Sequence, residues 1–192
     1  MKVILIGAGR LATNLGKALL EAGHDILQVY SRTMESASAL ATLAGGAPVT
    51  EIEKVRKDAD VYIISVKDSV LPDLVQALCS GRSTKVFLHT AGSVNMDVFA
   101  GMALHYGVFY PMQSFSKEKT VSFHDIPCFV EANDDYARDV LMQLAQGLTT
   151  KIYQLSSEDR KYLHLSAVFA CNFVNHCYTV SYDTVSYTHL TL

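Results

Sequence analysis

The chain has 192 residues, of which 49% are hydrophobic and 18% are charged, and its formal net charge is -3. This composition can bury a substantial core, which excludes an intrinsically disordered chain. The slightly negative charge argues against a general nucleic-acid binder, and no apolar run reaches the ~18 residues that a membrane-spanning helix needs. We therefore expect a soluble, cytoplasmic globular protein.

The cysteines show no C-x-x-C spacing; they are Cys79, Cys128, Cys171 and Cys177. This pattern predicts free, mostly buried thiols in a reducing compartment rather than disulfides or a zinc site. No metal site is predicted.

The chain opens on a short apolar run typical of a buried strand, and apolar residues then recur at helical spacing. Between them stands a G-x-G-x-x-A pattern made by Gly7, Gly9 and Ala12. Gly7 permits a tight turn, Gly9 lets a pyrophosphate approach the backbone, and Ala12 lets the helix pack closely on the strand. The pattern predicts a dinucleotide site, with Arg10 and Leu11 at the helix N-terminus that faces the phosphates. A tight turn without a ligand is the alternative.

The residues after the second strand indicate which dinucleotide binds. An NAD-preferring site usually has an acidic residue ~20 residues after the glycines. This chain has Ser31, Arg32 and Thr33 there instead. Arg32 can hold a 2′-phosphate with its planar donor fork, and the two hydroxyls can add donors. The cofactor is therefore predicted to be NADP. The alternative is that Arg32 is a solvated loop residue and that Ser31 or Thr33 only caps the next helix.

Strands and helices alternate over the first 155 residues. The predicted strands cover residues 2–6, 25–30, 59–66, 85–89, 106–110, 126–131 and 151–155, with a brief extended piece at 48–50. This alternation predicts an α/β fold with a doubly wound parallel sheet, a Rossmann domain over residues 1–155. Pro127 indicates an edge position for the strand that contains it.

Ligands of such sheets lie at the carboxyl ends of the strands. Val66 and Lys67 end one predicted strand, and the small residues Thr90, Ala91 and Gly92 follow the next. We expect these five residues to border the cofactor.

A second domain is predicted over residues 156–192, beginning with a helix. Its start resembles a capping box, with the hydroxyl of Ser156 three residues before Asp159. At ~100° per residue, one broad face of this helix gathers polar groups among apolar neighbours. That face holds Arg160, His164, Val168 and Asn175, with Asn172 at its margin.

Such a face can supply a proton donor to a site shared with the first domain. We predict that His164 is the general acid, because its unperturbed pKa of about 6.5 suits neutral pH. Asn172, Asn175 and Gln113 are predicted to orient a carbonyl or imine. The alternative is that the helix makes structural hydrogen bonds at a dimer or domain interface.

Several segments together resemble one bacterial family; they are residues 7–12, 30–33, 89–93, 110–115 and 164–176. It is the Rossmann-like family that carries a C-terminal helical domain of unknown function. It is similar to pyrroline carboxylate reductase, the deazaflavin-linked NADP reductases, and the phosphogluconate and hydroxyisobutyrate dehydrogenases. The resemblance covers about residues 1–178. It implies an NADP-binding domain, a helical domain that forms a homodimer, and a site in the cleft between them, without a known substrate.

One departure narrows the chemistry. In the related hydroxyacid dehydrogenases a lysine and an asparagine lie one turn apart on the long interdomain helix. Here His164 stands where a catalytic cation is expected, and Lys161 is on another face. The resemblance therefore implies an NADP-dependent oxidoreductase acting on a small carbonyl, imine or alcohol. A non-catalytic NADP-binding or sensing module, and a transferase using the glycine turn for another phosphorylated ligand, are the alternatives.

The end of the chain changes character. Residues 179–192 are rich in Thr, Ser and Tyr, which disfavour a helix. We expect the helix to end near Tyr178, and residues 186–192 resemble read-through sequence. The chain is thus expected to be a fragment that ends within the second domain, with one apolar helix face left exposed.

Overall fold

The protein, described by a computed structural model over residues 1–116 and 121–186, is built on one eight-stranded sheet. Its strands are β1 (Lys2–Ile6), β2 (Asp25–Tyr30), β3 (Ala47–Val49), β4 (Val61–Ile64), β5 (Val86–His89), β6 (His105–Pro111), β7 (Cys128–Ala132) and β8 (Ile152–Gln154). The strand order is β3-β2-β1-β4-β5-β6-β7-β8. The first six strands are parallel in the Rossmann order, which confirms the predicted fold class.

The end of the sheet formed by β7 and β8 differs from the prediction. β7 pairs antiparallel with β6, so the sheet is mixed rather than wholly parallel. β7 is also paired with β8 on its other side, so the edge position inferred from Pro127 is wrong. Pro127 lies just before the strand, where its missing N–H removes no ladder hydrogen bond and its carbonyl accepts from Met112.

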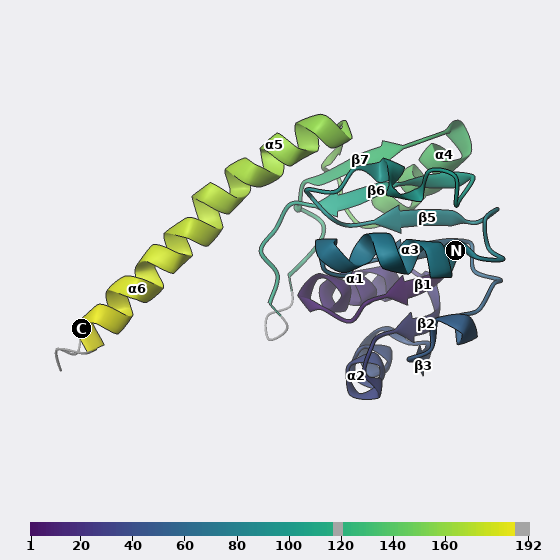
Figure 1. The fold of residues 1–192 in the computed structure, drawn as a ribbon, viewed down its shortest axis with the longest axis horizontal. Coiled ribbons are helices and arrows are strands. Elements are labelled where there is room, and N and C mark those ends of the chain that lie inside the picture. Colours follow the sequence, from purple (N-terminus) through teal and green to yellow (C-terminus); the bar gives the residue numbers. More distant parts are fainter. Residues whose placement is uncertain (117–120, 187–192) are drawn as a thin grey trace.

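Helices cover both faces of the sheet (Figure 1). They are α1 (Arg10–Glu21), α2 (Met34–Ala44), α3 (Leu71–Cys79) and α4 (Asp135–Gln146), with short 3₁₀ turns η1 (Ile52–Lys54), η2 (Asp68–Val70) and η3 (Met96–Phe99). Because side chains alternate along a strand, β1 contributes Val3 and Leu5 to the core under α1, α2 and α4. Its Ile4 and Ile6 join the opposite core, under α3 and η3.

The thiol prediction is only half right. Cys79 and Cys128 are buried, and desolvation raises the pKa of each thiol to about 12. Cys171 and Cys177 are exposed on the C-terminal helix. Among the described residues, no helix is long and apolar enough to cross a membrane, and no cluster of His, Cys, Asp or Glu could hold a metal ion.

A long helical rod leaves the α/β body after β8 (Figure 1). It consists of α5 (Ser157–Ala167), the π-helical segment η4 (Val168–Phe173) and α6 (Val174–Ser186). The expected helix end near Tyr178 is wrong, since the helix continues to Ser186. The hydroxyls of Thr179, Thr184 and Ser186 each donate to the carbonyl four residues earlier, so these side chains fit within the helix. Residues 187–192, which hold most of the predicted read-through sequence, lie outside the described residues.

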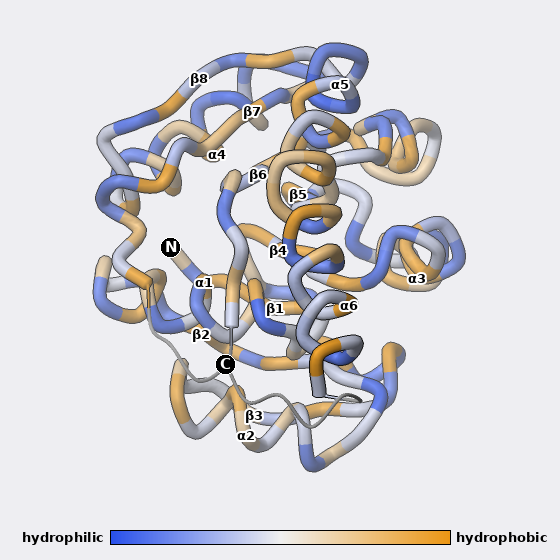
Figure 2. Tube along the Cα trace, turned by 90° about the vertical axis from the view of Figure 1, so that its left-hand side faces the viewer, coloured by the Kyte–Doolittle hydropathy of each residue, from blue (hydrophilic) through white to orange (hydrophobic). Residues whose placement is uncertain are grey.

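The outer part of the rod keeps its apolar side chains in solvent. Phe169, Phe173, Tyr178 and Tyr182 are all exposed, and Figure 2 shows hydrophobic segments along α6. This agrees with the exposed apolar face expected from the sequence. The homodimer remains a prediction.

A buried ion pair fastens the start of the rod to the sheet. Ser156 caps α5 by accepting the N–H of Asp159, as predicted. The Arg160 guanidinium, only 1% exposed, donates to the Glu131 carboxylate of β7 at 2.7 Å. Ser157 donates to the same carboxylate through its backbone N–H and its hydroxyl. This network fixes the position and rotation of α5 on the body.

Replacing Glu131 with alanine is expected to lower the free energy of unfolding by about 3–5 kcal/mol, because Arg160 would stay buried without its counter-charge. Urea denaturation measures this change. Glu158→Ala is the control, because Glu158 and Lys161 form an exposed pair with a 3.6 Å separation, which contributes about 1 kcal/mol at most. Equal, small effects of the two substitutions would contradict the anchoring role of Glu131.

Candidate functional site

A cavity of about 590 Å³ opens at the carboxyl edge of the sheet. It lies where the strand order reverses between β1 and β4, which is where such sheets bind ligands. Most of the residues predicted from the sequence line it: Gly7, Gly9, Arg10, Leu11, Ser31, Arg32, Val66, Lys67, Thr90, Ala91, Gly92 and His164. The structure thus brings the glycine turn, the loops after β2, β4 and β5, and one residue of the rod around a single cavity.

The glycine turn forms a bare backbone cradle on one wall. Gly7 has φ +109°, and a Cβ there would lie 2.2 Å from the Ser65 carbonyl oxygen, so only glycine fits. Gly9 precedes α1, and a Cβ built on it would have no atom within 4 Å. Within the described residues no side chain caps α1, so its first N–H groups remain available to an anion. This geometry fits the phosphates of a dinucleotide.

Positive charge surrounds this cradle. The side chains of Arg10, Arg32 and Lys67 all line the cavity and are all exposed. Among the described residues, none of the three side chains forms an ion pair or a hydrogen bond. Asp68 also lines the cavity, so the described lining has three cations and one carboxylate. This excess of positive charge favours an anionic ligand over a neutral one.

Thr33 has a different place from the one predicted. Its hydroxyl accepts the N–H of Ser36 at 3.4 Å and caps α2. It does not line the cavity, whereas Ser36 does. The donors grouped around Arg32 are therefore Ser31 and Ser36, one on each side of the cap.

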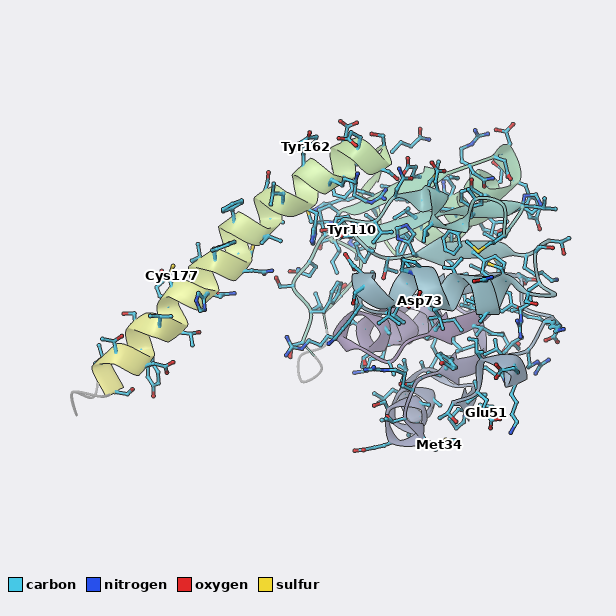
Figure 3. The ribbon with its side chains drawn as sticks, viewed as in Figure 1. Met34, Glu51, Asp73, Tyr110, Tyr162 and Cys177 are labelled. Atoms are coloured by element: carbon cyan, nitrogen blue, oxygen red, sulfur yellow. The ribbon has the colours of Figure 1, made fainter. Side chains whose placement is uncertain are left out.

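The rod brings His164 to the opposite end of the cavity. Arg160 lies one helical turn before His164, so the anchored turn of α5 sets where the imidazole falls. Its Nδ1 lies 2.9 Å from the hydroxyl oxygen of Tyr110, near the end of β6, and the two rings meet edge to face. Figure 3 shows Tyr110 in the body, on the side from which the rod departs.

Gly92 makes room for this histidine. A Cβ on Gly92 would lie 2.5 Å from Cγ and Nδ1 of His164. The space that the missing side chain of Gly92 leaves is therefore taken by the protein's own imidazole, although Gly92 also lines the cavity.

Besides Thr33, three further predicted residues do not line the cavity. Gln113 is exposed, and its side-chain oxygen accepts the N–H of Ser114. Asn172 and Asn175 are exposed on the rod. Asn172 lies within the π-helical segment and Asn175 follows it. Since a π-helix bonds residue i to i+5, counting 100° per residue from Arg160 does not give the direction of the side chains beyond it.

Sequence reasoning missed other residues of the cavity wall: Ser36, Ser65, Val70, Leu74 and Tyr110. Tyr110 had a usable signal, because it stands at the carboxyl end of a predicted strand, as Val66 and Thr90 do. Val70 and Leu74 had no such signal. In a sequence, an apolar residue that borders a ligand cannot be distinguished from an apolar residue that packs in the core.

Gly92→Ala is expected to lower the free energy of unfolding by about 1–3 kcal/mol, because the added methyl group must displace the His164 ring. Urea denaturation tests this. Gly147→Ala is the matched control, since its φ is -71° and a Cβ there would meet nothing closer than 3.5 Å. If Gly92→Ala were as mild as the control, His164 could not be seated on Gly92.

Two parts of the chain match known protein families. Residues 2–91 match a family described as NADP oxidoreductase, coenzyme F420-dependent. Residues 126–191 match a domain of unknown function, DUF2520, which begins here at β7 within the sheet. A search of curated proteins found no match.

Solved structures extend the comparison. A candidate NADP oxidoreductase from Bacteroides fragilis is 46% identical, with a TM-score of 0.93 over 98% of this chain and 73% of that chain. A protein from Thermotoga maritima is 20% identical, with a TM-score of 0.79 over 99% of this chain and 72% of that one. A pyrroline-5-carboxylate reductase from Coxiella burnetii is 17% identical, with a TM-score of 0.70 over 98% and 72%, and shows the same fold. The chain therefore belongs to the family of Rossmann-fold NADP oxidoreductases that carry the DUF2520 domain.

Proposed function

We propose that this protein uses NADP(H) to reduce a small carbonyl or imine compound, or to oxidise the corresponding alcohol. The observation that carries the proposal is that one cavity holds a bare glycine cradle with uncompensated cations at one end and an imidazole at the other. A dinucleotide would span these ends, with its phosphates on the Gly9 side and its reactive ring toward His164.

The preference for NADP over NAD is supported by the wall after β2. Arg32 is exposed and uncompensated there, with Ser31 and Ser36 beside it in the cavity lining. The lining residues that follow β2 include no carboxylate among the described residues, and Asp68, which lines the same cavity, follows β4 instead. The guanidinium can neutralise a 2′-phosphate, and the two hydroxyls can donate hydrogen bonds to it. NAD lacks this phosphate and would gain nothing from these three groups.

The bound nicotinamide would supply the hydride, and the protein would supply the proton. His164 is the proposed donor, and this is supported by its imidazole lining the cavity among the described residues. Reduction breaks one N–H bond of the His164 imidazolium and forms an O–H or N–H bond on the product. The imidazole then takes a proton from solvent before the next turnover.

Thermal unfolding with NADPH, with NADH and without ligand tests the cofactor. NADPH at ~100 times its dissociation constant should add about 2.7 kcal/mol of stability, which raises the melting temperature by several degrees for a domain of this size. Arg32→Ala should weaken NADPH binding ~10-fold or more and leave NADH binding unchanged, because a charge-assisted hydrogen bond contributes about 1.5–3 kcal/mol. An unchanged preference in Arg32→Ala would remove this residue from cofactor selection. Failure of the unsubstituted protein to bind either nucleotide would support the transferase alternative.

His164→Ala is expected to lower the rate of NADPH oxidation at least ~100-fold in a screen of small ketones and cyclic imines. His176→Ala is the control, because His176 is exposed on α6 and should leave the rate unchanged. NADPH binding without turnover of any compound would favour the non-catalytic sensing module. A nearly normal rate in His164→Ala would exclude it as the donor.

A further inference from the structure

We propose that Tyr110 is a positioning residue for proton transfer, which holds the His164 ring by Nδ1 so that Nε2 exchanges the proton with the substrate. This inference rests on the proposed function and adds to it a residue that was not among the site residues predicted from the sequence.

The surroundings of the imidazole leave it little freedom. The Tyr110 hydroxyl oxygen lies 2.9 Å from Nδ1, and the ring centroids are 5.8 Å apart at an interplanar angle of 79°. The backbone of Gly92 lies against the same Cγ–Nδ1 side of the ring. A hydrogen bond and a close backbone contact thus meet on one side of the imidazole, and both would have to break for the ring to turn over.

Tyr110 is itself firmly held. Its side chain is 8% exposed, and its ring packs against Phe129 of the neighbouring strand β7 at a centroid distance of 6.4 Å. Since its backbone belongs to β6 inside the sheet, the hydroxyl is a fixed point against which the rod places His164.

The hydroxyl suits both protonation states of the histidine. Burial raises the pKa of the Tyr110 phenol; Arg160 opposes this and Asp68 adds to it, so the group stays an O–H at neutral pH. A hydroxyl can donate to Nδ1 of a neutral imidazole and can accept from Nδ1–H of an imidazolium or of the other neutral tautomer. The same contact can therefore persist before and after Nε2 loses its proton.

Nε2 is the nitrogen left for chemistry. Within the described part of the chain it has no hydrogen-bond partner, and it is not among the buried polar atoms. In the reductive direction the Nε2–H bond breaks, the proton joins the substrate oxygen or nitrogen, and the hydride comes from the reduced nicotinamide. The Nδ1–H bond to Tyr110 remains intact, so the ring keeps its orientation for reprotonation.

Tyr110→Phe tests the contact directly, because it removes only the hydroxyl. In ¹⁵N-histidine-labelled protein, the Nδ1 resonance of His164 is expected to shift, while the other six histidines of the chain keep theirs. Tyr153→Phe is the matched control, since Tyr153 stacks on Phe129, the same ring that Tyr110 packs against, and is 51% exposed. An unchanged Nδ1 resonance in Tyr110→Phe would overturn the proposal without any measurement of activity.

A double-mutant cycle with NADPH and the ketone and imine screen tests the role. Tyr110→Phe should lower kcat ~10-fold and leave NADPH binding intact, but it should have no further effect in a His164→Ala background. Independent, multiplying effects, or a normal kcat in Tyr110→Phe, would overturn the positioning role. If unsubstituted protein neither binds nor oxidises NADPH, the proposed function fails, and so does the positioning role of Tyr110 in proton transfer. A shifted Nδ1 resonance would still establish the contact between Tyr110 and His164.

Discussion

The buried contact between Arg160 and Glu131 is the interaction on which the site depends. A long helix held to the sheet only by apolar contacts could rotate or slide, and a shift of one residue would turn its side chains by ~100°. The guanidinium instead donates from Nη1 to the carboxylate of Glu131 in β7 and from Nη2 to the carbonyl of Val94 in the loop after β5. Because two nitrogens of one rigid, planar guanidinium bond to partners on different segments, these bonds together restrict both where α5 lies and which face it presents.

The two ends of the cavity are therefore built in different ways. At one end, the backbone of a short segment around Gly7 and Gly9 makes the cradle, and the parallel strands bring Arg32 and Lys67 beside it. At the other end, the site requires β5, β6, β7 and α5 to meet. His164 reaches the cavity because Arg160 anchors its helix, and because Gly92 leaves no side chain in the way.

This difference explains which predictions held. The alternation of strands and helices is a local pattern, and the sheet confirms the fold that it predicts. The glycine turn and the residues at strand ends are local patterns too, and they line one cavity, while their role in binding a cofactor stays a prediction. The edge position inferred from Pro127 is wrong, because a proline just before a strand removes no ladder hydrogen bond, and neither does a proline in an edge strand. The Thr33 hydroxyl caps α2 by accepting the N–H of Ser36, so this local hydrogen bond sets the position of its side chain outside the cavity lining.

The sequence by itself determined the Rossmann sheet, the anion cradle and the positive charge around it, because these arise from strand periodicity, from glycines and from residues at strand ends. Tertiary structure alone decided that Tyr110 faces His164, that Arg160 is an anchor rather than a catalytic cation, and that Asn172 and Asn175 lie outside the cavity. A helical pattern gives the angle between residues on one regular helix. It gives neither the rotation of that helix against a sheet nor the change of phase at a π-helical segment, because both depend on contacts between residues far apart in the chain.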